Sequence, residues 1–419
     1  MNSFPMSLVY GGWSVIMETD MIQIGDVTMD FNRIHNRKQT HSYKWDQVGK
    51  LFGSEDILPL WVADMDFESP PAVKEAVQRR AAQGIYGYTF KPEAYTQAII
   101  GWFARRHNWQ LKAEWLTDSP SVVTSLSLAV DLLSEPGSKV ILQSPVYYPF
   151  YDVIRNNGRE IVRNPLILSN GRYEMDYEQL ESVMKDGARL LLLCNPHNPG
   201  GRVWTREELL RLGELCLHYG VKVVSDEIHC DLVLPGHRYT PFASLSPEIA
   251  DITLTCLAPT KTFNMPGLQI SFIVASNKRI KQLFDARIKT LSLHMTGFFT
   301  PDAVCAAYEH GDAWLDELLD YIQGNVEYAE RYFREHLPAI RVIQPQGTYL
   351  MWIDCTALGL SVEALKRLMY EEARVAFNEG STFGSEGAGF LRINLACPRA
   401  ILQEALERFC AAARKHIQP

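Results

Sequence analysis

The 419-residue sequence lacks several features that would place it in a specialised class of proteins. No apolar run approaches the roughly 20 residues that a membrane-spanning helix needs. No long run of lysines and arginines offers a surface for nucleic acid or an anionic membrane, and the net charge is −8, from 41 basic and 49 acidic residues. The first 17 residues are mildly apolar but lack the basic segment of a signal peptide, so we expect none. We therefore predict neither a nucleic-acid partner nor a membrane partner.

Cysteine clusters are also missing. The eight cysteines are scattered, with no CxxC pair and no spacing typical of a metal site. Several lie in apolar runs, which is typical of buried thiols in a reducing compartment. Apolar residues make up 47% of the chain and charged residues 21%, the balance of an ordinary globular protein. We predict a cytoplasmic protein that binds no metal.

Strands and helices alternate through the middle of the chain. The continuous apolar run at 190–194 is typical of a strand buried in a parallel sheet. Further strands are predicted at 221–225 and 252–257. Between the first two, residues 205–218 have the pattern of an amphipathic helix that begins with a capping box. This alternation predicts an α/β fold, in which helices cover both faces of a mostly parallel sheet.

The last part of the chain has a different character. Strands predicted at 348–353 and 390–393 lie among helices, which indicates a smaller α+β domain. We predict an N-terminal segment, 1–71, that contributes to this small domain. The large domain is predicted to span 72–304 and the small domain 305–419.

Lys261 lies on a predicted turn between two buried strands, 252–257 and 268–275. Burying an ammonium group is costly unless it is paired or chemically consumed. A Schiff base with an aldehyde cofactor consumes it and makes the lysine a catalyst, whereas an ordinary surface lysine is the alternative. Asp226 favours the catalytic interpretation, because it ends the strand 221–225 and ligand sites form at such strand ends. A Schiff-base lysine with an aspartate partner for a pyridinium nitrogen is typical of a pyridoxal 5′-phosphate (PLP) site.

Six motifs occur in the order in which one known family carries them. They are WVADMDF at 61–67, GIYGY at 84–88, CNPHNPGG at 194–201, SDEIH at 225–229, KTFN at 261–264 and FLRIN at 390–394. Through these motifs the sequence resembles the cystathionine β-lyase (MalY/PatB) family of aminotransferase-like PLP enzymes, from about residue 42 to residue 414. The resemblance implies the fold-type I fold of PLP-dependent transferases, with a seven-stranded sheet in the large domain. It also implies a homodimer with shared active sites.

The resemblance assigns cofactor-binding roles to individual residues. Lys261 holds the cofactor and is the catalytic residue, and Asp226 keeps the ring nitrogen protonated, although an aspartate at a strand end can simply cap a turn. Asn198 donates a hydrogen bond to the phenolic oxygen, although asparagines are common in turns. Tyr147 stacks on the pyridine ring. His229 stands where many aminotransferases carry a tyrosine beside the cofactor.

The cofactor's phosphate needs N–H donors, which a helix N-terminus supplies. The helix that opens at Ser121 brings Val123 and Thr124, and the hydroxyl of Thr260 is a further donor. The family commonly has glycine where this chain has Ser121. Tyr88 resembles the tyrosine that reaches the phosphate in the neighbouring subunit, and packing alone is the alternative for it.

Two residues are expected to bind the substrate. Arg392 lies inside an apolar strand, and its planar guanidinium suits a substrate carboxylate; a structural salt bridge is the alternative. The backbone N–H of Ala63 is expected to meet the same carboxylate.

The resemblance implies a carbon–sulfur β-lyase. The expected substrate is an amino-acid thioether such as L-cystathionine, which α,β-elimination would convert to homocysteine, pyruvate and ammonia. A class I/II aminotransferase is the alternative, but Gln269 stands where classical aminotransferases carry a phosphate-binding arginine. A regulatory protein that modulates transcription on a PLP fold is a further alternative. The intact set of Lys261, Asp226 and Arg392 argues against a protein without catalytic activity.

Overall fold

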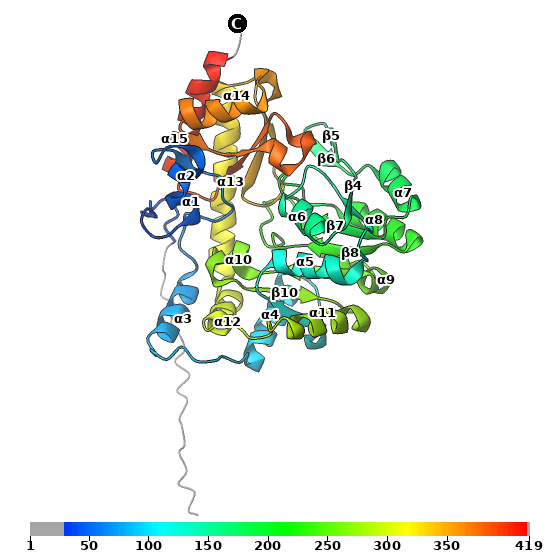
Figure 1. The fold of residues 1–419 in the computed structure, drawn as a ribbon. Coiled ribbons are helices and arrows are strands. Elements are labelled where there is room, and N and C mark those ends of the chain that lie inside the picture. Colours follow the sequence, from blue (N-terminus) through cyan, green and yellow to red (C-terminus); the bar gives the residue numbers. More distant parts are fainter. Residues whose placement is uncertain (1–28, 417–419) are drawn as a thin grey trace, which may run out of the picture. The chain divides into compact units, whose positions relative to one another are not determined.

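A computed structural model describes residues 29–416 of the chain, which divides into two units, Met1–Asp30 and Phe31–Pro419. Nearly all of the first unit, and with it the segment in which we expect no signal peptide, lies outside the described residues. The second unit carries every element of regular structure given below (Figure 1). None of the described helices combines the length and the apolar character needed to cross a membrane.

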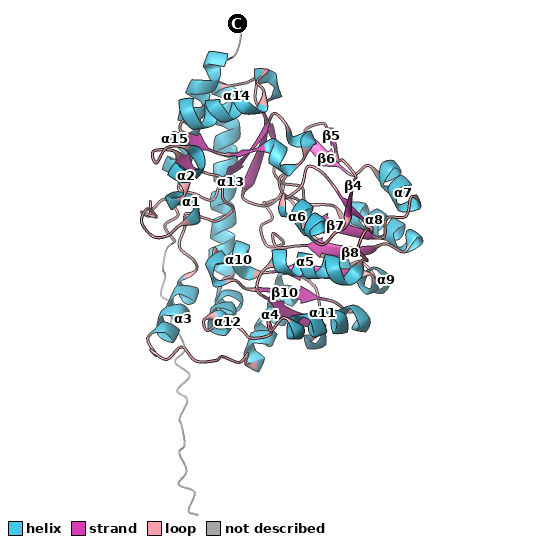
Figure 2. Ribbon diagram, viewed as in Figure 1, coloured by secondary structure: helices cyan, strands magenta, loops and turns pink. Residues whose placement is uncertain are grey.

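The larger sheet of this unit has seven strands in the order β2-β10-β9-β8-β7-β3-β4 (Figure 2). Its strands are β2 (Leu116–Ser119), β3 (Lys139–Leu142), β4 (Glu160–Arg163), β7 (Leu190–Cys194), β8 (Lys222–Asp226), β9 (Thr253–Leu257) and β10 (Ser271–Val274). Strand β10 runs antiparallel to both of its neighbours, and the other neighbouring pairs are parallel. The prediction of a mostly parallel seven-stranded sheet is confirmed.

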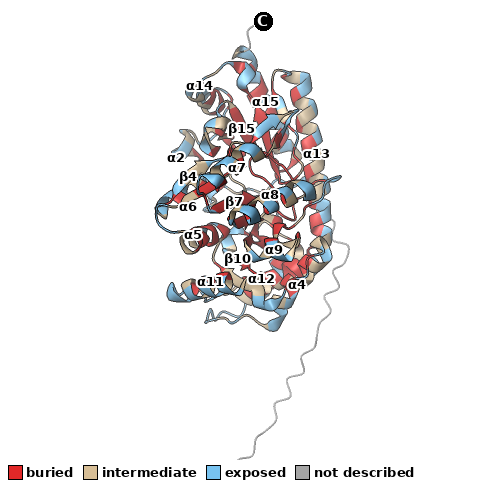
Figure 3. Cartoon of the chain, turned by 90° about the vertical axis from the view of Figure 1, so that its right-hand side faces the viewer, coloured by how far each residue is buried: buried red, intermediate tan, exposed pale blue. Residues whose placement is uncertain are grey.

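Helices cover both faces of this sheet, because its strands are apolar on both sides. Leu190 and Leu192 of β7 pack in one core with helices α5 (Val122–Leu133), α6 (Pro149–Asn156) and α11 (Lys278–Thr290). Leu191 and Leu193 of the same strand pack in the opposite core with α7 (Tyr177–Lys185), α8 (Arg206–Tyr219) and α9 (Pro247–Asp251). Figure 3 shows the buried residues on the strands and on the inner sides of the flanking helices. This layering confirms the predicted α/β class.

The C-terminal part of the chain builds a four-stranded sheet in the order β11-β12-β15-β14. Its antiparallel strands are β11 (Arg341–Ile343), β12 (Leu350–Asp354), β14 (Asn378–Glu379) and β15 (Phe390–Asn394). The N-terminal strand β1 (Leu58–Pro59) pairs in parallel with β13 (Val375–Ala376) from the same part of the chain. An N-terminal segment thus contacts the C-terminal part, while the domain boundaries themselves stay a prediction.

Between the large sheet and the C-terminal sheet, the chain passes through helices α11, α12 (Thr300–His310) and α13 (Asp312–His336). Helices α12 and α13 meet at Gly311, where the sequence predicts a break. A Cβ atom at Gly311 would lie 2.3 Å from the Ala307 carbonyl oxygen and 2.4 Å from the Phe263 ring, so only glycine fits there. Figure 1 shows α13 running past α10 toward the C-terminal sheet. The remaining helices and the small hairpin are α1 (Tyr43–Asp46), α2 (Val48–Phe52), α3 (Pro71–Ala81), α4 (Glu93–His107), α14 (Val362–Arg367), α15 (Arg399–Ala413), β5 (Ile167–Ser169) and β6 (Arg172–Glu174).

The segment that carries Lys261 differs from the prediction of a simple turn. It forms a one-turn helix, α10 (Pro259–Thr262), followed by a 3-10 helix, Pro266–Leu268. Pro259 is the first helical residue, a position that suits proline because the missing N–H would have no partner there. Strand β10 consequently starts only at Ser271, three residues later than predicted.

Candidate active site

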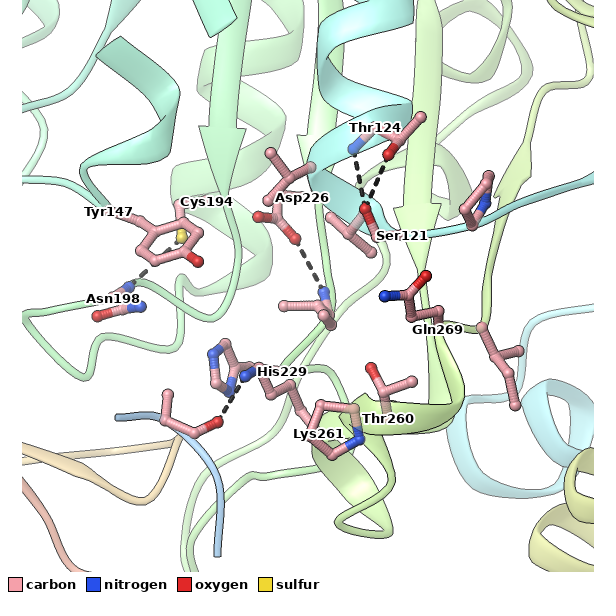
Figure 4. Close-up of a pocket in the computed structure, with 17 residues that line it drawn as sticks. Ser121, Thr124, Tyr147, Cys194, Asn198, Asp226, His229, Thr260, Lys261 and Gln269 are labelled. Carbon is pink, nitrogen blue, oxygen red and sulfur yellow. Dashed lines mark hydrogen bonds between the residues drawn. The ribbon is translucent and has the colours of Figure 1, made fainter. Parts of the chain in front are cut away.

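A cavity of about 420 Å³ lies where the C-terminal ends of β7 and β8 approach helix α10 and the N-terminus of α5. This volume is in the range of small-molecule sites. Figure 4 shows Tyr147 and Asn198 on one side of the space, Ser121 and Thr124 on another, and Lys261 below Asp226. The predicted site residues that line the cavity are Ala63, Val123, Thr124, Tyr147, Asn198, Asp226, His229, Thr260 and Lys261.

Lys261 projects from α10 toward Ala63. Its Nζ donates a hydrogen bond of 2.5 Å to the Ala63 carbonyl oxygen, and it forms no ion pair with any described residue. Burial lowers the pKa of the Lys261 amine to about 8, with Asp64 and Asp226 opposing the shift and Arg392 adding to it. About a tenth of the amine is therefore neutral and nucleophilic at pH 7, far more than for an ordinary lysine.

Asp226 ends strand β8 with only 3% of its surface exposed. The one hydrogen bond that the described residues give to its carboxylate comes from the Ile228 N–H, at 3.2 Å to Oδ1. Burial raises the pKa of Asp226 to about 7, opposed by that N–H and by the charge of Lys261. A buried carboxylate without a cation is costly, so the site is suited to a ligand that brings a positive charge to this position.

Arg392 is a second buried charge without a counterion. It lies on β15 with 3% exposure and forms no ion pair with any described residue. Its guanidinium donates to Asn198 Oδ1 at 2.9 Å, to Asn378 Oδ1 at 2.7 Å and to the Trp61 carbonyl oxygen at 3.1 Å, while its buried Nε has no partner. Burial lowers the pKa of Arg392 to about 10. The alternative of a structural salt bridge has no support among the described residues, and the open position suits an anion.

Asn198 accepts a hydrogen bond from Arg392 and also lines the cavity. Because its side-chain oxygen accepts from Arg392, the amide nitrogen is the atom left to donate to a ligand. The Asn198 carbonyl oxygen also accepts the Tyr147 N–H at 3.0 Å, which fixes the segment that presents the Tyr147 ring to the cavity. Burial raises the pKa of Tyr147, so its phenol stays neutral.

The N-terminus of α5 forms the anion-binding side of the cavity. Ser121 caps the helix by accepting the Thr124 N–H at 3.1 Å, and its hydroxyl lies 2.9 Å from the Thr124 hydroxyl. The other N–H groups of the first turn, including that of Val123, have no intrahelical partner. Together with the helix dipole and the Thr260 hydroxyl, they suit a phosphate group.

His229 lies at the cavity with its buried Nδ1 unpartnered. Burial, with the positive charges of Lys261 and Arg392, lowers the pKa of His229 to about 3, so the imidazole is neutral.

Sequence reasoning missed Cys194 and Ile228, which also line the cavity. Cys194 could have been found, since it is the last residue of an apolar strand.

Two predicted residues, Arg392 and Tyr88, do not line the cavity. Arg392 contacts it through Asn198, whereas Tyr88 contacts none of the other predicted residues. It lies in the connector before α4 with 98% of its surface exposed, and it does not line the cavity of its own chain. Gln269 does line it, held in the left-handed region with φ of +51°.

A further group of buried polar residues lies behind Lys261. Asp231 accepts hydrogen bonds from Thr262 Oγ1 at 2.7 Å and Trp102 Nε1 at 2.9 Å, and it lies 2.6 Å from His107 Nε2. His107, Cys230 and Asp231 offer ligand atoms within 4.8 Å of one another, a spacing that could hold a metal ion. Because both Asp231 oxygens already accept hydrogen bonds, we interpret the group as a network that holds helix α10 in place.

Residues 55–409 match the model of the family described as aminotransferase class I and II. The chain is 47% identical over 385 residues to cystathionine β-lyase PatB of Bacillus subtilis (strain 168), which covers 92% of this chain and 100% of PatB.

Solved structures agree with this likeness. A PLP-bound protein of Clostridium difficile 630, described as a candidate aminotransferase, is 45% identical with a TM-score of 0.91, over 92% of this chain and 100% of that one. The PLP-bound C–S lyase of Staphylococcus hominis is 30% identical with a TM-score of 0.87, over 92% of this chain and 98% of that one.

Proposed function

We infer that this chain, which belongs to the aminotransferase class I and II family, is a PLP-dependent carbon–sulfur β-lyase. The proposed substrates are L-cystathionine and related cysteine S-conjugates, and the products are a thiol, pyruvate and ammonia. The names of PatB and of the Staphylococcus hominis enzyme support the activity. The observation that carries the proposal is one cavity with a nucleophilic amine at Lys261 and an unpaired carboxylate at Asp226, next to the unpaired Arg392.

The residues in and around the cavity match the functional groups of PLP. The cofactor's aldehyde matches the amine of Lys261, its ring nitrogen supplies the cation that Asp226 lacks, and its phosphate matches the N-terminus of α5. The amide of Asn198 and the ring of Tyr147 flank the remaining space. When bound, PLP supplies an electron sink for the charge that develops at the substrate's Cα.

The chain's own residues account for binding and proton transfer. Arg392 binds the substrate's α-carboxylate with its free guanidinium edge. The Lys261 amine, once free of the cofactor, removes the proton from Cα. The Cβ–S bond then breaks, and the sulfur leaves with the electron pair and takes up a proton. The three-carbon product reacts with one water to give pyruvate and ammonia.

Transamination is the second candidate, because the Clostridium difficile protein is described as a candidate aminotransferase. Both reactions begin with removal of the Cα proton, so Lys261 and Asp226 serve either one. Gln269 at the phosphate side of the cavity favours the lyase, since it stands where classical aminotransferases carry an arginine.

The deciding experiment supplies purified, PLP-loaded protein with L-cystathionine. Pyruvate and homocysteine are measured in one assay, and amino-group transfer to an added keto acid in another. We expect stoichiometric pyruvate and thiol with little transfer. Transfer without thiol release would establish the aminotransferase, and a Lys261→Ala variant controls for the reaction of free PLP.

We further propose a homodimer in which Tyr88 completes the phosphate site of the partner subunit. Four large apolar side chains of the connector are exposed, at 78% for Ile85, 66% for Tyr86, 98% for Tyr88 and 81% for Phe90. Contiguous exposed apolar residues are typical of an interaction surface. A second copy of the chain with the same patch would bury them in an isologous interface.

We propose that the large and the small domain carry different residues of the site. The large domain, 72–304, carries Lys261 and the phosphate side of the site. The small domain, 305–419 with the segment 1–71, carries Arg392. The β1–β13 pairing and the hydrogen bond from Arg392 to the Trp61 carbonyl support this grouping. The proposed cytoplasmic location draws support from the eight cysteines, which are all free thiols.

A further inference from the structure

The Ala63 carbonyl oxygen accepts two hydrogen bonds, both from residues far from it in the sequence. Lys261 Nζ donates to it at 2.5 Å, across 198 residues of sequence. The Tyr349 hydroxyl donates to the same oxygen at 2.9 Å, across 286 residues. A carbonyl oxygen has two lone pairs, so these two donors fill its capacity. The amine and the phenol therefore share one acceptor at the edge of the cavity.

Tyr349 is held for this contact by its surroundings. Only 1% of its surface is exposed, and burial raises its pKa, so the hydroxyl stays protonated and able to donate. Its ring packs edge-on against His229, with centroids 6.0 Å apart. The preceding residue, Thr348, has φ of +66°, an outlier for a β-branched residue. Such backbone strain persists where the surrounding structure fixes it and is enriched at functional sites.

Hydrogen bonds from two other parts of the chain hold the segment that contains Ala63. Asn264 accepts the Met65 N–H at 2.9 Å and donates to the Met65 carbonyl at 3.1 Å, which ties the segment to the region of Lys261. Asn394 donates to the Val62 carbonyl at 2.6 Å, which ties it to β15. These bonds fix the peptides around Ala63, whereas the Ala63 carbonyl itself is held, among described residues, by Tyr349 and Lys261 alone.

We propose that Tyr349 is a positioning residue that fixes the Ala63 carbonyl as the docking point of the free Lys261 amine. The inference rests on the proposed function for its catalytic meaning. Ala63 lines the cavity beside the position expected for the substrate's carboxylate, which is bonded to Cα. A Lys261 amine that is hydrogen-bonded to Ala63 is held close to the Cα proton that it must remove. The lysine side chain is then already in the conformation that proton removal requires.

Tyr349→Phe tests the proposal, because it removes only the hydroxyl. The matched control is Tyr173→Phe. Tyr173 is also buried, its hydroxyl accepts one hydrogen bond, from Trp352 Nε1 at 3.1 Å, and it does not line the cavity. Melting temperatures of both variants check that each one folds, and the two should fall by similar amounts.

The first measurement needs neither cofactor nor substrate. Cofactor-free protein is reductively methylated with formaldehyde, and modification of Lys261 is followed by mass spectrometry. The amine must leave the Ala63 oxygen to react, so a less firmly held carbonyl should raise the rate in Tyr349→Phe by roughly threefold or more. Tyr173→Phe should react at the wild-type rate. An unchanged rate in Tyr349→Phe would overturn the proposal.

The second measurement uses the PLP-loaded enzyme. Loss of one hydrogen bond should lower kcat roughly three- to tenfold, with KM within about twofold because no substrate contact is lost. The isotope effect with Cα-deuterated substrate should rise, since proton removal becomes slower. A raised KM with unchanged kcat would instead make Tyr349 a substrate contact and overturn the proposal. If the wild-type protein releases no pyruvate, the proposed lyase activity fails, while the methylation result still decides where the amine docks.

Discussion

Asp226→Asn should have opposite consequences in the cofactor-free and the PLP-loaded protein. In the cofactor-free protein, burial raises the pKa of Asp226 from 3.8 to about 7, although the Ile228 N–H and the charge of Lys261 oppose the shift. One pKa unit corresponds to about 1.4 kcal/mol, so ionised Asp226 costs on the order of 4 kcal/mol of folding free energy. Asparagine cannot ionise and avoids this cost.

The sign of the pH dependence follows from proton linkage. Between the unfolded and folded pKa values, the folded state binds more protons than the unfolded state, so stability from this group falls as the pH rises. The stabilisation is fully present below pH 4 and is lost as the pH passes about 7. An asparagine amide can itself lack a partner, but that cost does not change with pH. Relative to wild type, Asp226→Asn should therefore gain about 2–3 kcal/mol between pH 5 and pH 8.5.

The assay is thermal unfolding of cofactor-free wild type and Asp226→Asn at several pH values, with exposed Asp152→Asn as the control. The melting temperature of Asp226→Asn relative to wild type should rise by a few degrees over this range. After loading with PLP, the wild type should become the more stable protein, because the cofactor's cation pairs with the carboxylate. A difference that does not change with pH in the cofactor-free protein would refute the reasoning.

Three further changes test the site and the assembly. Lys261→Ala should abolish pyruvate release and covalent retention of PLP with little change in melting temperature; release near the wild-type rate would remove Lys261 from the mechanism. Arg392→Ala should raise KM strongly, since losing a buried charged contact costs about 2–5 kcal/mol, and loss of bound PLP would instead place Arg392 in the cofactor site. Tyr88→Phe should weaken PLP retention, and refolding it together with Lys261→Ala should restore activity at one site per mixed dimer. Absence of recovery in confirmed mixed dimers would contradict the shared site.

Local patterns in the sequence predict much of the fold. The apolar run at β7 is buried on both faces, and the capping box at Thr205 and Glu208 begins α8 as predicted. Gly311 separates two helices at the predicted point, and glycine disfavours a helix interior because it loses the most backbone entropy there. In each case the deciding factor is a property of one residue or of residues close in the sequence, so a local sequence pattern can record it.

The sequence predicts candidate site residues where a polar or charged residue stands at or just after the end of a buried strand. Asp226 is the last residue of one buried strand and Lys261 follows another, and the structure brings both to one cavity with Asn198 and Thr124. The helical geometry of the Lys261 segment was not predictable, since a turn and a one-turn helix use the same residues. Whether Tyr88 reaches a partner subunit stays a prediction, because one chain leaves it exposed.

The sequence alone determined the layered α/β architecture, because periodicity and capping are local. Strand-end chemistry marked Lys261 and Asp226, and resemblance to a family supplied most of the other candidate site residues. Only the tertiary structure decided that Arg392 has no ion pair with any described residue and that Lys261 and Tyr349 meet on the Ala63 carbonyl. The two hydrogen bonds to the Ala63 carbonyl span 198 and 286 residues. They depend on how the seven-stranded sheet, the four-stranded sheet and the N-terminal segment pack together, and no local pattern in the sequence records that packing.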